Sequence, residues 1–405
     1  MNKTIEQTEN KTKNLIEKAE EKLLFTTVRP NIIMEKGKGM YLWDVEGKCY
    51  LDFIGGWAVT CLGHCPEVIT EALQQQSNKL INASPSFYNE PMIKLADLLV
   101  EHSCFDRVFF TSTGSEANEG AIKLARKYGQ KFKNGAYEII TTINSFHGRT
   151  LAAMAATGKE AWETLFQPKM PGFKHVPFND IDSVKASISN NTAAIMIEPI
   201  QGEGGVIPAE ESYVKALREL CDENNILLIF DEVQTGIGRT GTLFAYEQYG
   251  IEPDIMTLAK GIGGGFPLSA MLTKEKFNIF DIGDQGGTYC GQPLAMAAGY
   301  AVVNEVINKS LDKNAKAAGE YIIKELEKIK DKYGLKNIRG RGLLIGFDLP
   351  QEKGRELVND CLEKELIINS PRPSIIRLMP PLICSYEDIK KMIGILSESL
   401  SDLLI

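Results

Sequence analysis

Five runs of large apolar residues, each followed by polar residues and a helical segment, constrain the fold of this chain more than any other feature. They lie between residues 107 and 260 and read RVFFTS, YEIITTI, AAIMIEPI, ILLIFDE and DIMTLAK. Alternation of apolar strands with helices predicts an α/β fold with a mostly parallel sheet and helices on both faces. The fourth run ends on two adjacent carboxylates, Asp231 and Glu232. A charge at the end of a buried strand is costly without a partner, and a ligand can be that partner.

The segments on either side of these runs predict a second, smaller unit. A chain of 405 residues is too long for one hydrophobic core, so two domains of unequal size are expected. Residues 40–53 alternate around Glu46-Gly47 and predict a hairpin. Strands near LLIGFDL and IIRLMPP lie among helices in the last hundred residues. We predict an N-terminal arm and hairpin that join the small domain, a large domain, and a C-terminal small α+β domain, over residues 1–60, 61–304 and 305–405.

Composition and charge exclude several classes of function. The net charge of -8 and the pI of about 5.4 disfavour an electrostatically held nucleic acid or an anionic membrane. No apolar run is long enough to span a membrane, and the polar N-terminus lacks the apolar core of a secretory signal. The eight cysteines are scattered, which favours a reducing, cytoplasmic location. Cys61, His64 and Cys65 lack a fourth ligand nearby, so we predict no metal site.

Polar residues follow each apolar run at the point where the strand is expected to end. In an open parallel sheet, ligands bind beyond the carboxyl ends of the strands. The first two runs lead into TSTGSEANE and NSFHGRT, and the third leads into Glu198 and then QGEGG. The last two lead into Asp231 and into Lys260, which precedes GIGGG. Five convergent polar segments predict a binding site at one edge of the sheet.

The segment TSTGSEANE has two interpretations. Thr113, Gly114 and Ser115 stand where a helix begins, and the free N–H groups and positive end of a helix suit a phosphate. Thr113 and Glu116 also have the spacing of a capping box, which needs no ligand. The segment alone does not decide between the two. It matches neither GxxxxGK[ST] nor GxGxxG, so a nucleoside-triphosphate or dinucleotide cradle is not supported.

Lys260 stands at the end of a buried strand, before three consecutive glycines at 263–265. A lysine near apolar groups loses its proton more easily and becomes a nucleophilic amine. The glycines let the backbone approach a ligand closely. The alternative, a lysine that extends its ammonium group into solvent, is the commoner fate of lysines. The position of Lys260 among the other strand ends favours the functional interpretation.

A phosphate site, a reactive lysine and a buried carboxylate together match the needs of one cofactor, pyridoxal 5′-phosphate. The lysine carries the cofactor as a Schiff base, and the cofactor ring withdraws electrons only while its nitrogen keeps a proton. Asp231 would hold that proton by its opposite charge. Phe146, at the end of the second run, could stack on the ring. An ordinary core aromatic is the alternative for Phe146.

These residues lie in motifs that resemble the class III, ornithine-type aminotransferases of PLP fold type I. The motifs are TSTGSEANEGAIKLARK, FHGRTLAAMAATG, IEPIQGEGGVIPA, LLIFDEVQTGIGRTG, LAKGIGGGFPLSAML, GTYCGQP and INSPRPSIIRLMPPL, and they occur in this order from about residue 28 onward. The resemblance implies a large domain with a mostly parallel seven-stranded sheet between helices. It also implies that the C-terminal segment and N-terminal residues form a smaller α+β domain.

The resemblance implies a cofactor site shared between two subunits. Lys260 would bind the cofactor and move the proton, Asp231 would hold the ring nitrogen, and Gln234 would lie near the ring hydroxyl. Thr288 would reach the phosphate of the neighbouring subunit, which implies a homodimer. The implied cofactor-binding set is Thr113, Gly114, Ser115, Phe146, His147, Asp231, Val233, Gln234, Lys260 and Thr288.

The resemblance also implies residues that bind substrates. Arg149 would bind a substrate carboxylate beside the ring, and Arg377 would bind the α-carboxylate of 2-oxoglutarate or glutamate. Glu203 would pair with Arg377 while the amino donor reacts and swing away for glutamate. Trp57 stands where the family commonly has a smaller aliphatic residue, so it would reshape the substrate entrance. GHCPEV, Cys290 and Gln292 also depart from the family pattern.

The resulting expectation is an aminotransferase with a ping-pong cycle. The terminal amino group of N-acetylornithine, or of a similar ω-amino acid, passes to the cofactor, and 2-oxoglutarate then takes it and leaves as glutamate. Such a reaction belongs to arginine biosynthesis. Ornithine, succinylornithine and 4-aminobutyrate are the alternative donors. A glutamate-1-semialdehyde-type aminomutase and a non-catalytic protein that binds pyridoxal 5′-phosphate are the alternative classes.

Overall fold

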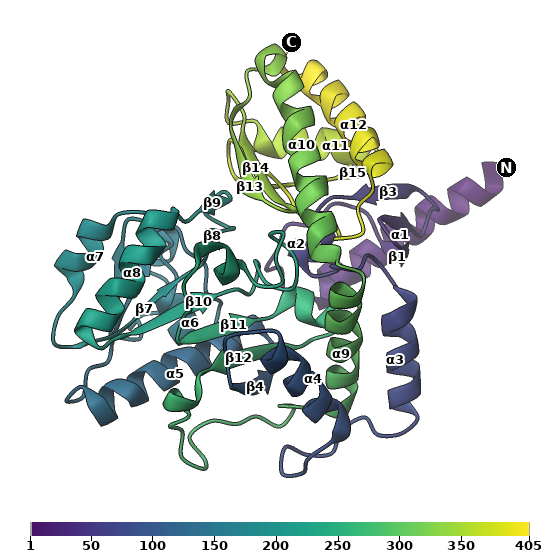
Figure 1. Cartoon of the computed structure of the whole chain (residues 1–405). Coiled ribbons are helices and arrows are strands. Elements are labelled where there is room, and N and C mark those ends of the chain that lie inside the picture. Colours follow the sequence, from purple (N-terminus) through teal and green to yellow (C-terminus); the bar gives the residue numbers. More distant parts are fainter. Residues whose placement is uncertain (1, 405) are drawn as a thin grey trace.

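A seven-stranded sheet forms the centre of the computed structural model, which describes the backbone of residues 2–404 and the side chains of residues 11–404 (Figure 1). Its strand order is β4-β12-β11-β10-β7-β5-β6. All neighbours pair in parallel except β12, which is antiparallel to both β11 and β4. The strands are β4 (Arg107–Thr111), β5 (Glu138–Thr142), β6 (Phe173–Val176), β7 (Thr192–Ile197), β10 (Leu227–Asp231), β11 (Ile255–Leu258) and β12 (Ser269–Thr273). The five apolar runs are five of these strands, so this prediction is confirmed.

The central strands are apolar throughout because both faces of the sheet are covered. Along β10, Leu227 and Ile229 pack with helix α5 (Gly114–Phe132), whereas Leu228 and Phe230 pack with α8 (Glu211–Asn224). Strands covered on both faces read as continuous apolar runs. Only residues at the strand ends are then free to be polar without a buried partner.

The remaining helices surround this layer. Helix α9 packs against α3, α4 and the short turn η3 that begins at Lys260. The bounds are α1 (Asn2–Lys22), α2 (Gly55–Ala58), α3 (Glu67–Ser77), α4 (Glu90–Glu101), α6 (Leu151–Ala156), α7 (Ile181–Ser187) and α9 (Pro293–Asn308). Four 3-10 turns are η1 (Glu160–Trp162), η2 (Ala245–Tyr249), η3 (Lys260–Gly263) and η4 (Glu275–Phe277). Among the described residues, no helix is long and apolar enough to cross a membrane.

N-terminal and C-terminal strands meet in one of two smaller sheets, and the other sheet is formed by C-terminal strands alone, above the central sheet in Figure 1. The predicted hairpin is present as β2 and β3, and β15 of the C-terminal segment adds to β3 in parallel. This pairing supports the predicted association of residues 1–60 with the small domain. The boundaries at 60 and 304 stay a prediction.

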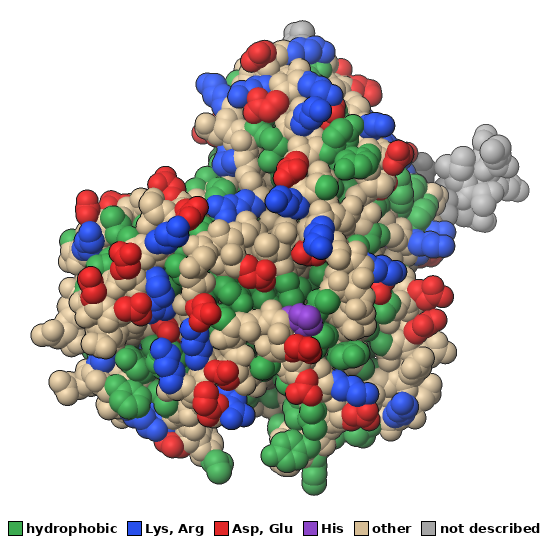
Figure 2. Space-filling view, in the orientation of Figure 1, with side chains coloured by type: hydrophobic (Ala, Val, Ile, Leu, Met, Phe, Trp, Pro, Cys, Tyr) green, Lys and Arg blue, Asp and Glu red, His purple; other side chains and the backbone are tan. Residues whose placement is uncertain are grey.

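The first small sheet contains β1 (Met34–Lys38), β2 (Tyr41–Asp44), β3 (Cys49–Asp52) and β15 (Leu366–Ile367). The second contains β13 (Lys336–Arg341), β14 (Leu344–Asp348), β17 (Ile375–Leu378) and β16 (Asn369–Arg372). Helices α10 (Leu311–Tyr333), α11 (Gly354–Glu363) and α12 (Tyr386–Leu404) accompany them, and a two-stranded ribbon joins β8 (Ile200–Gln201) to β9 (Ile207–Pro208). Figure 2 shows basic and acidic side chains interspersed over the visible face, so neither sign dominates it.

Candidate active site

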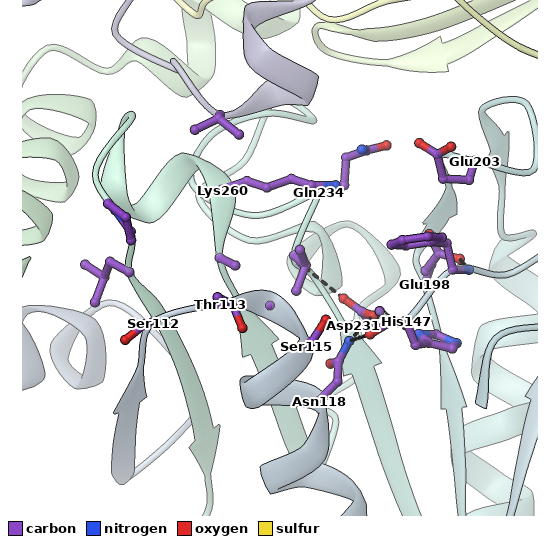
Figure 3. A pocket seen from close by; sticks show the side chains of 18 of the residues that line it. Ser112, Thr113, Ser115, Asn118, His147, Glu198, Glu203, Asp231, Gln234 and Lys260 are labelled. Atoms are coloured by element: carbon purple, nitrogen blue, oxygen red, sulfur yellow. Dashed lines mark hydrogen bonds and ion pairs between the residues drawn. The ribbon is translucent and has the colours of Figure 1, made fainter. Parts of the chain in front are cut away.

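A cavity of about 370 Å³ lies at the carboxyl ends of the parallel strands, where the sequence predicts a site. Figure 3 shows its polar side chains around one space, with Lys260 and Gln234 above Asp231, His147 and Asn118 in this view. Its lining includes ten of the fourteen predicted site residues. They are Thr113, Gly114, Ser115, Phe146, His147, Glu203, Asp231, Val233, Gln234 and Lys260.

The two adjacent carboxylates at the end of β10 serve different ends, because successive side chains of a strand point in opposite directions. Glu232 is completely buried and accepts hydrogen bonds from the backbone N–H groups of Ala245 and Tyr246, at 2.6 and 2.8 Å. Burial raises the pKa of Glu232 to about 7. Asp231 instead lines the cavity. Glu232 therefore fixes a loop, and Asp231 is free to face a ligand.

A hydrogen-bond network fixes the carboxylate of Asp231. Its Oδ2 accepts from Asn118 Nδ2 at 2.8 Å and lies 2.7 Å from His147 Nδ1, and its Oδ1 accepts from the Val233 N–H at 3.0 Å. Thr257 donates to Asn118 Oδ1 at 2.7 Å and so orients the amide. The second ring nitrogen of His147 is buried and has no hydrogen-bond partner among the described residues.

His147 and Asp231 form a buried, hydrogen-bonded pair. Burial opposes a charged imidazole, but the hydrogen bond to Asp231 and its negative charge outweigh burial and raise the pKa of His147. The same carboxylate lines the cavity, where a cationic ring nitrogen of a ligand could share it.

The start of helix α5 shows that the two interpretations of TSTGSEANE are compatible. The capping box is formed: Thr113 Oγ1 accepts from the Glu116 N–H, and the Glu116 carboxylate accepts from the Thr113 N–H. The backbone N–H groups of Gly114 and Ser115 have no acceptor among the described residues. A Cβ at Gly114 would lie 3.0 Å from Val233 Cγ1, so glycine allows close packing here. Two free donors at a helix N-terminus suit a phosphate.

Lys260 points a partly buried amine into the cavity from a backbone of left-handed conformation, with φ of 49°. This conformation is uncommon for a residue other than glycine, and such strain often lies at functional sites. Burial lowers the pKa of Lys260 to about 8, even though Glu203 and Asp231 favour its charged form. A neutral, nucleophilic amine is thus accessible much nearer to neutral pH than for a lysine in water.

Arg377 is completely buried beside the cavity and pairs with the predicted gate residue. Its Nη1 lies 2.7 Å from Glu203 Oε1 and 3.3 Å from Gln234 Oε1, and Asn369 accepts from Nε and Nη2. Burial disfavours the carboxylate form of Glu203, but Arg377 outweighs it and lowers the pKa of Glu203. The Glu203 side chain is 39% exposed, so it has room to leave Arg377 for solvent.

Four predicted residues do not line the cavity, although two of them adjoin it. Arg377 contacts Glu203 and Gln234, and the Arg149 N–H donates to Ser115 Oγ at 3.2 Å. Trp57 is 53% exposed in a left-handed turn that precedes the cavity residue Val59. Thr288 lies in an exposed loop and does not reach this chain's own cavity.

Two buried polar residues of the site, Asn118 and Glu198, were not among the fourteen predicted site residues. Asn118 lies one turn into α5 on its buried face, where an asparagine is a detectable anomaly. Glu198 follows β7 and accepts from the Phe146 N–H at 3.0 Å. Burial raises the pKa of Glu198 to about 7. Its position at a strand end was evident from the sequence, but its contact with the loop that carries Phe146 was not.

These residues fit pyridoxal 5′-phosphate. The free N–H groups at the start of α5 suit its phosphate, Lys260 suits its aldehyde, and Asp231 suits its ring nitrogen. Phe146 on one side and Val233 on another provide apolar walls for a flat ring.

Comparison with known proteins gives the same result from an independent direction. The family model described as Aminotransferase class-III matches residues 26–400. Acetylornithine aminotransferase of Ralstonia nicotianae is 51% identical over 381 residues, which cover 92% of this chain and 96% of that protein. Acetylornithine aminotransferase of Methanocaldococcus jannaschii is 47% identical over 376 residues, with coverage of 92% and 94%.

Solved structures of similar proteins share the whole architecture. The ornithine aminotransferase of Toxoplasma gondii superposes with a TM-score of 0.93 at 30% identity and covers 97% of this chain and 95% of that one. The acetylornithine aminotransferase of Elizabethkingia anophelis superposes with a TM-score of 0.86 at 32% identity, with coverage of 96% and 99%.

Proposed function

Because the chain belongs to the class III aminotransferases, enzymes of PLP fold type I, we propose that it transfers the terminal amino group of N-acetylornithine to 2-oxoglutarate. The observation that carries the proposal is the Arg377–Glu203 pair beside Lys260. An enzyme that alternates two substrates of different charge needs a cation that can be covered and uncovered. The names of relatives at 47–51% identity support the choice of donor.

The residues of the cavity divide the work of the reaction. Pyridoxal 5′-phosphate, when bound, supplies an aldehyde that accepts an amino group and a ring that withdraws electrons. Lys260 would hold the aldehyde end, and its amine, when free, would be placed to carry a proton. Asp231, fixed by Asn118 and His147, would favour the protonated ring nitrogen.

Glu203 and Arg377 adapt one pocket to two substrates. In the structure Glu203 neutralises Arg377, so the pocket there is suited to a donor that presents its distal amine without a neighbouring carboxylate. When glutamate or 2-oxoglutarate enters, its α-carboxylate would take the place of Glu203 on the planar guanidinium. Arg149, whose backbone N–H donates to Ser115 Oγ, would bind the carboxylate at the far end of either substrate.

The proposal is tested by titrating the visible absorption band of the purified holoenzyme with N-acetylornithine, without any keto acid. The band of the lysine-bound cofactor is expected to bleach and to return when 2-oxoglutarate is added, with glutamate formed. Ornithine, succinylornithine and 4-aminobutyrate serve as comparison donors and should bleach the band less efficiently. A band that responds better to one of these would replace the proposed donor, and a band that responds to none would contradict the aminotransferase cycle.

The two half-reactions should separate in the variant Arg377→Ala. We expect a loss of about 10²-fold or more in the rate constant for 2-oxoglutarate, because its α-carboxylate loses a bidentate charged partner. The half-reaction with N-acetylornithine should lose much less, since Glu203 covers Arg377 during that step. Rapid mixing of each half-reaction measures both. An equal loss in both halves would refute the gate, and Arg377→Lys separates charge from geometry.

We further propose that a second copy of the chain completes the site. Large apolar side chains are exposed on two loops that a hydrogen bond joins, among them Phe87, Tyr88 and Ile282. Asn89 Nδ2 donates to the Gly291 carbonyl at 2.8 Å and joins these loops, and the exposed Thr288 belongs to the second of them. A solution mass of one chain would contradict this.

The eight cysteines, all unpaired, support a reducing compartment such as the cytoplasm.

A further inference from the structure

Trp162 contacts Phe146, which lines the cavity, and also two cations, Arg149 and Lys159, at the edge of the active site. It ends the turn η1 and is 7% exposed, although its neighbours on both sides in the chain are exposed. Its ring makes an edge-to-face contact with Phe146 at 5.8 Å. The guanidinium carbon of Arg149 and the Nζ of Lys159 each lie 5.0 Å from the ring centroid of Trp162. One indole thus contacts a ring that lines the cavity and two positive groups.

Neither cation has a carboxylate within ion-pair distance among the described residues, and both are exposed. Both positive groups lie within cation–π distance of the Trp162 ring, and they repel each other because they are held near the same ring. The negative face of an indole attracts cations and offsets part of that repulsion. An anion placed near both cations would offset the remaining repulsion between them, so the arrangement is suited to bind a carboxylate.

The pair of cations also lies within the electrostatic field of the active site. Burial disfavours the ionised form of Glu203, whereas Arg377, Lys260 and also Lys159 favour it and lower its pKa. The Arg149 N–H donates to Ser115 Oγ, one residue from the free N–H of Gly114. A carboxylate bound by Arg149 and Lys159 would therefore belong to a molecule whose other end reaches Lys260.

We propose that Trp162 is a positioning residue that holds the guanidinium of Arg149, with the ammonium of Lys159 beside it, for the carboxylate of the amino donor. This inference rests on the proposed function, because it needs a donor that carries both a distal amine and a carboxylate. Lys159 is the second cation of this subsite. Trp162 acts through its contacts with Arg149 and Phe146, so it fixes the position of the guanidinium relative to the ring of Phe146.

The test compares two donors that differ only in the carboxylate, N-acetylornithine and N-acetylputrescine. Stopped-flow mixing with the holoenzyme gives the dissociation constant and the limiting rate of the donor half-reaction separately. For Trp162→Leu and Lys159→Gln we expect about three- to tenfold weaker binding of N-acetylornithine, in line with the strength of cation–π and exposed charge contacts. The limiting rate and the binding of N-acetylputrescine should change less than twofold.

Two sets of variants separate positioning from folding. Trp162→Tyr keeps an aromatic face and should restore most of the affinity, and Trp162→Phe keeps the edge contact to Phe146 if the leucine variant does not fold. Lys36 lies 5.1 Å from the ring centroid of Trp43 in the N-terminal sheet, outside the site, and is the matched control pair. Lys36→Gln and Trp43→Leu should leave both donors unaffected.

Several results would overturn the inference. Equal weakening of both donors in Trp162→Leu would mean that Trp162 only supports the fold, and unchanged binding of N-acetylornithine would mean that it positions nothing. If the wild-type enzyme ignores N-acetylornithine, the proposed donor is wrong, and the comparison is repeated with 4-aminobutyrate and butylamine. An effect confined to 4-aminobutyrate would then support the subsite, and no difference between the two would refute it.

Discussion

Replacing Lys260 with alanine is expected to abolish amino transfer, with kcat lower by about 10⁴-fold or more, the upper range for loss of a positioned acid–base group. The variant loses both the covalent attachment of the cofactor and the amine that carries the proton. Pyridoxal 5′-phosphate should still bind through the start of α5 and Asp231, whose contacts do not involve the lysine. Turnover with both substrates, and the absorption band of the bound cofactor, measure the two effects.

Stability should change little in Lys260→Ala. The lysine amine forms no hydrogen bond or ion pair with the described residues, and its charge is disfavoured by burial. Lys274, which follows β12 at the opposite end of the same sheet and pairs with Glu252, is the matched control. Lys274→Ala should keep near-normal turnover. Substantial activity in Lys260→Ala would mean that another amine performs the step.

Asp231→Asn is expected to reduce kcat by about two to four orders of magnitude, because removing one partner of a buried charge pair costs about 3–5 kcal/mol. Asparagine keeps the shape of the side chain but cannot hold a proton on the ring nitrogen of the cofactor. The network of Asn118 and His147 around it would remain partly satisfied. Turnover numbers with saturating cofactor, and thermal unfolding of the same sample, check the expectation.

The adjacent residue gives the control for this prediction. Glu232→Gln removes an equally buried carboxylate that accepts from the backbone N–H groups of the loop at 245–246 and from the Thr235 hydroxyl, and that does not line the cavity. One of those N–H groups would lose its acceptor, at a cost of about 1–3 kcal/mol in the free energy of unfolding. Its kcat should stay within a few-fold of wild type. If the two variants lost activity to the same extent, the distinct role of Asp231 would be refuted.

The strands and the edge of the sheet that carries the site were predictable, because a strand buried on both faces appears in the sequence as a continuous apolar run. Position at the ends of such runs singled out Lys260 and the adjacent carboxylates Asp231 and Glu232, and the needs of the cofactor together with the family resemblance then selected Asp231. The alternation of strands and helices predicted the fold class, and the family resemblance implied the seven-stranded sheet. The structure confirms both the hairpin at residues 40–53 and the sheet.

Contacts across segments could not be predicted in the same way. The sequence did not show that Asp231 and Glu232 divide into site and loop, because that depends on where the segment around 245 packs. The roles of Asn118 and Glu198 depend on hydrogen bonds to distant loops. Trp162 has no signature at all, since the ring meets Phe146 and Arg149 only after the chain has folded back.

The most direct test of the account is to reduce the purified holoenzyme with borohydride and map the peptide that carries the cofactor. Reduction fixes pyridoxal 5′-phosphate on whichever lysine holds it. The account predicts a single modified residue, Lys260, whose amine lines the cavity at the strand ends. Modification of any other lysine as the main product, or no fixed cofactor after saturation with pyridoxal 5′-phosphate, would contradict it.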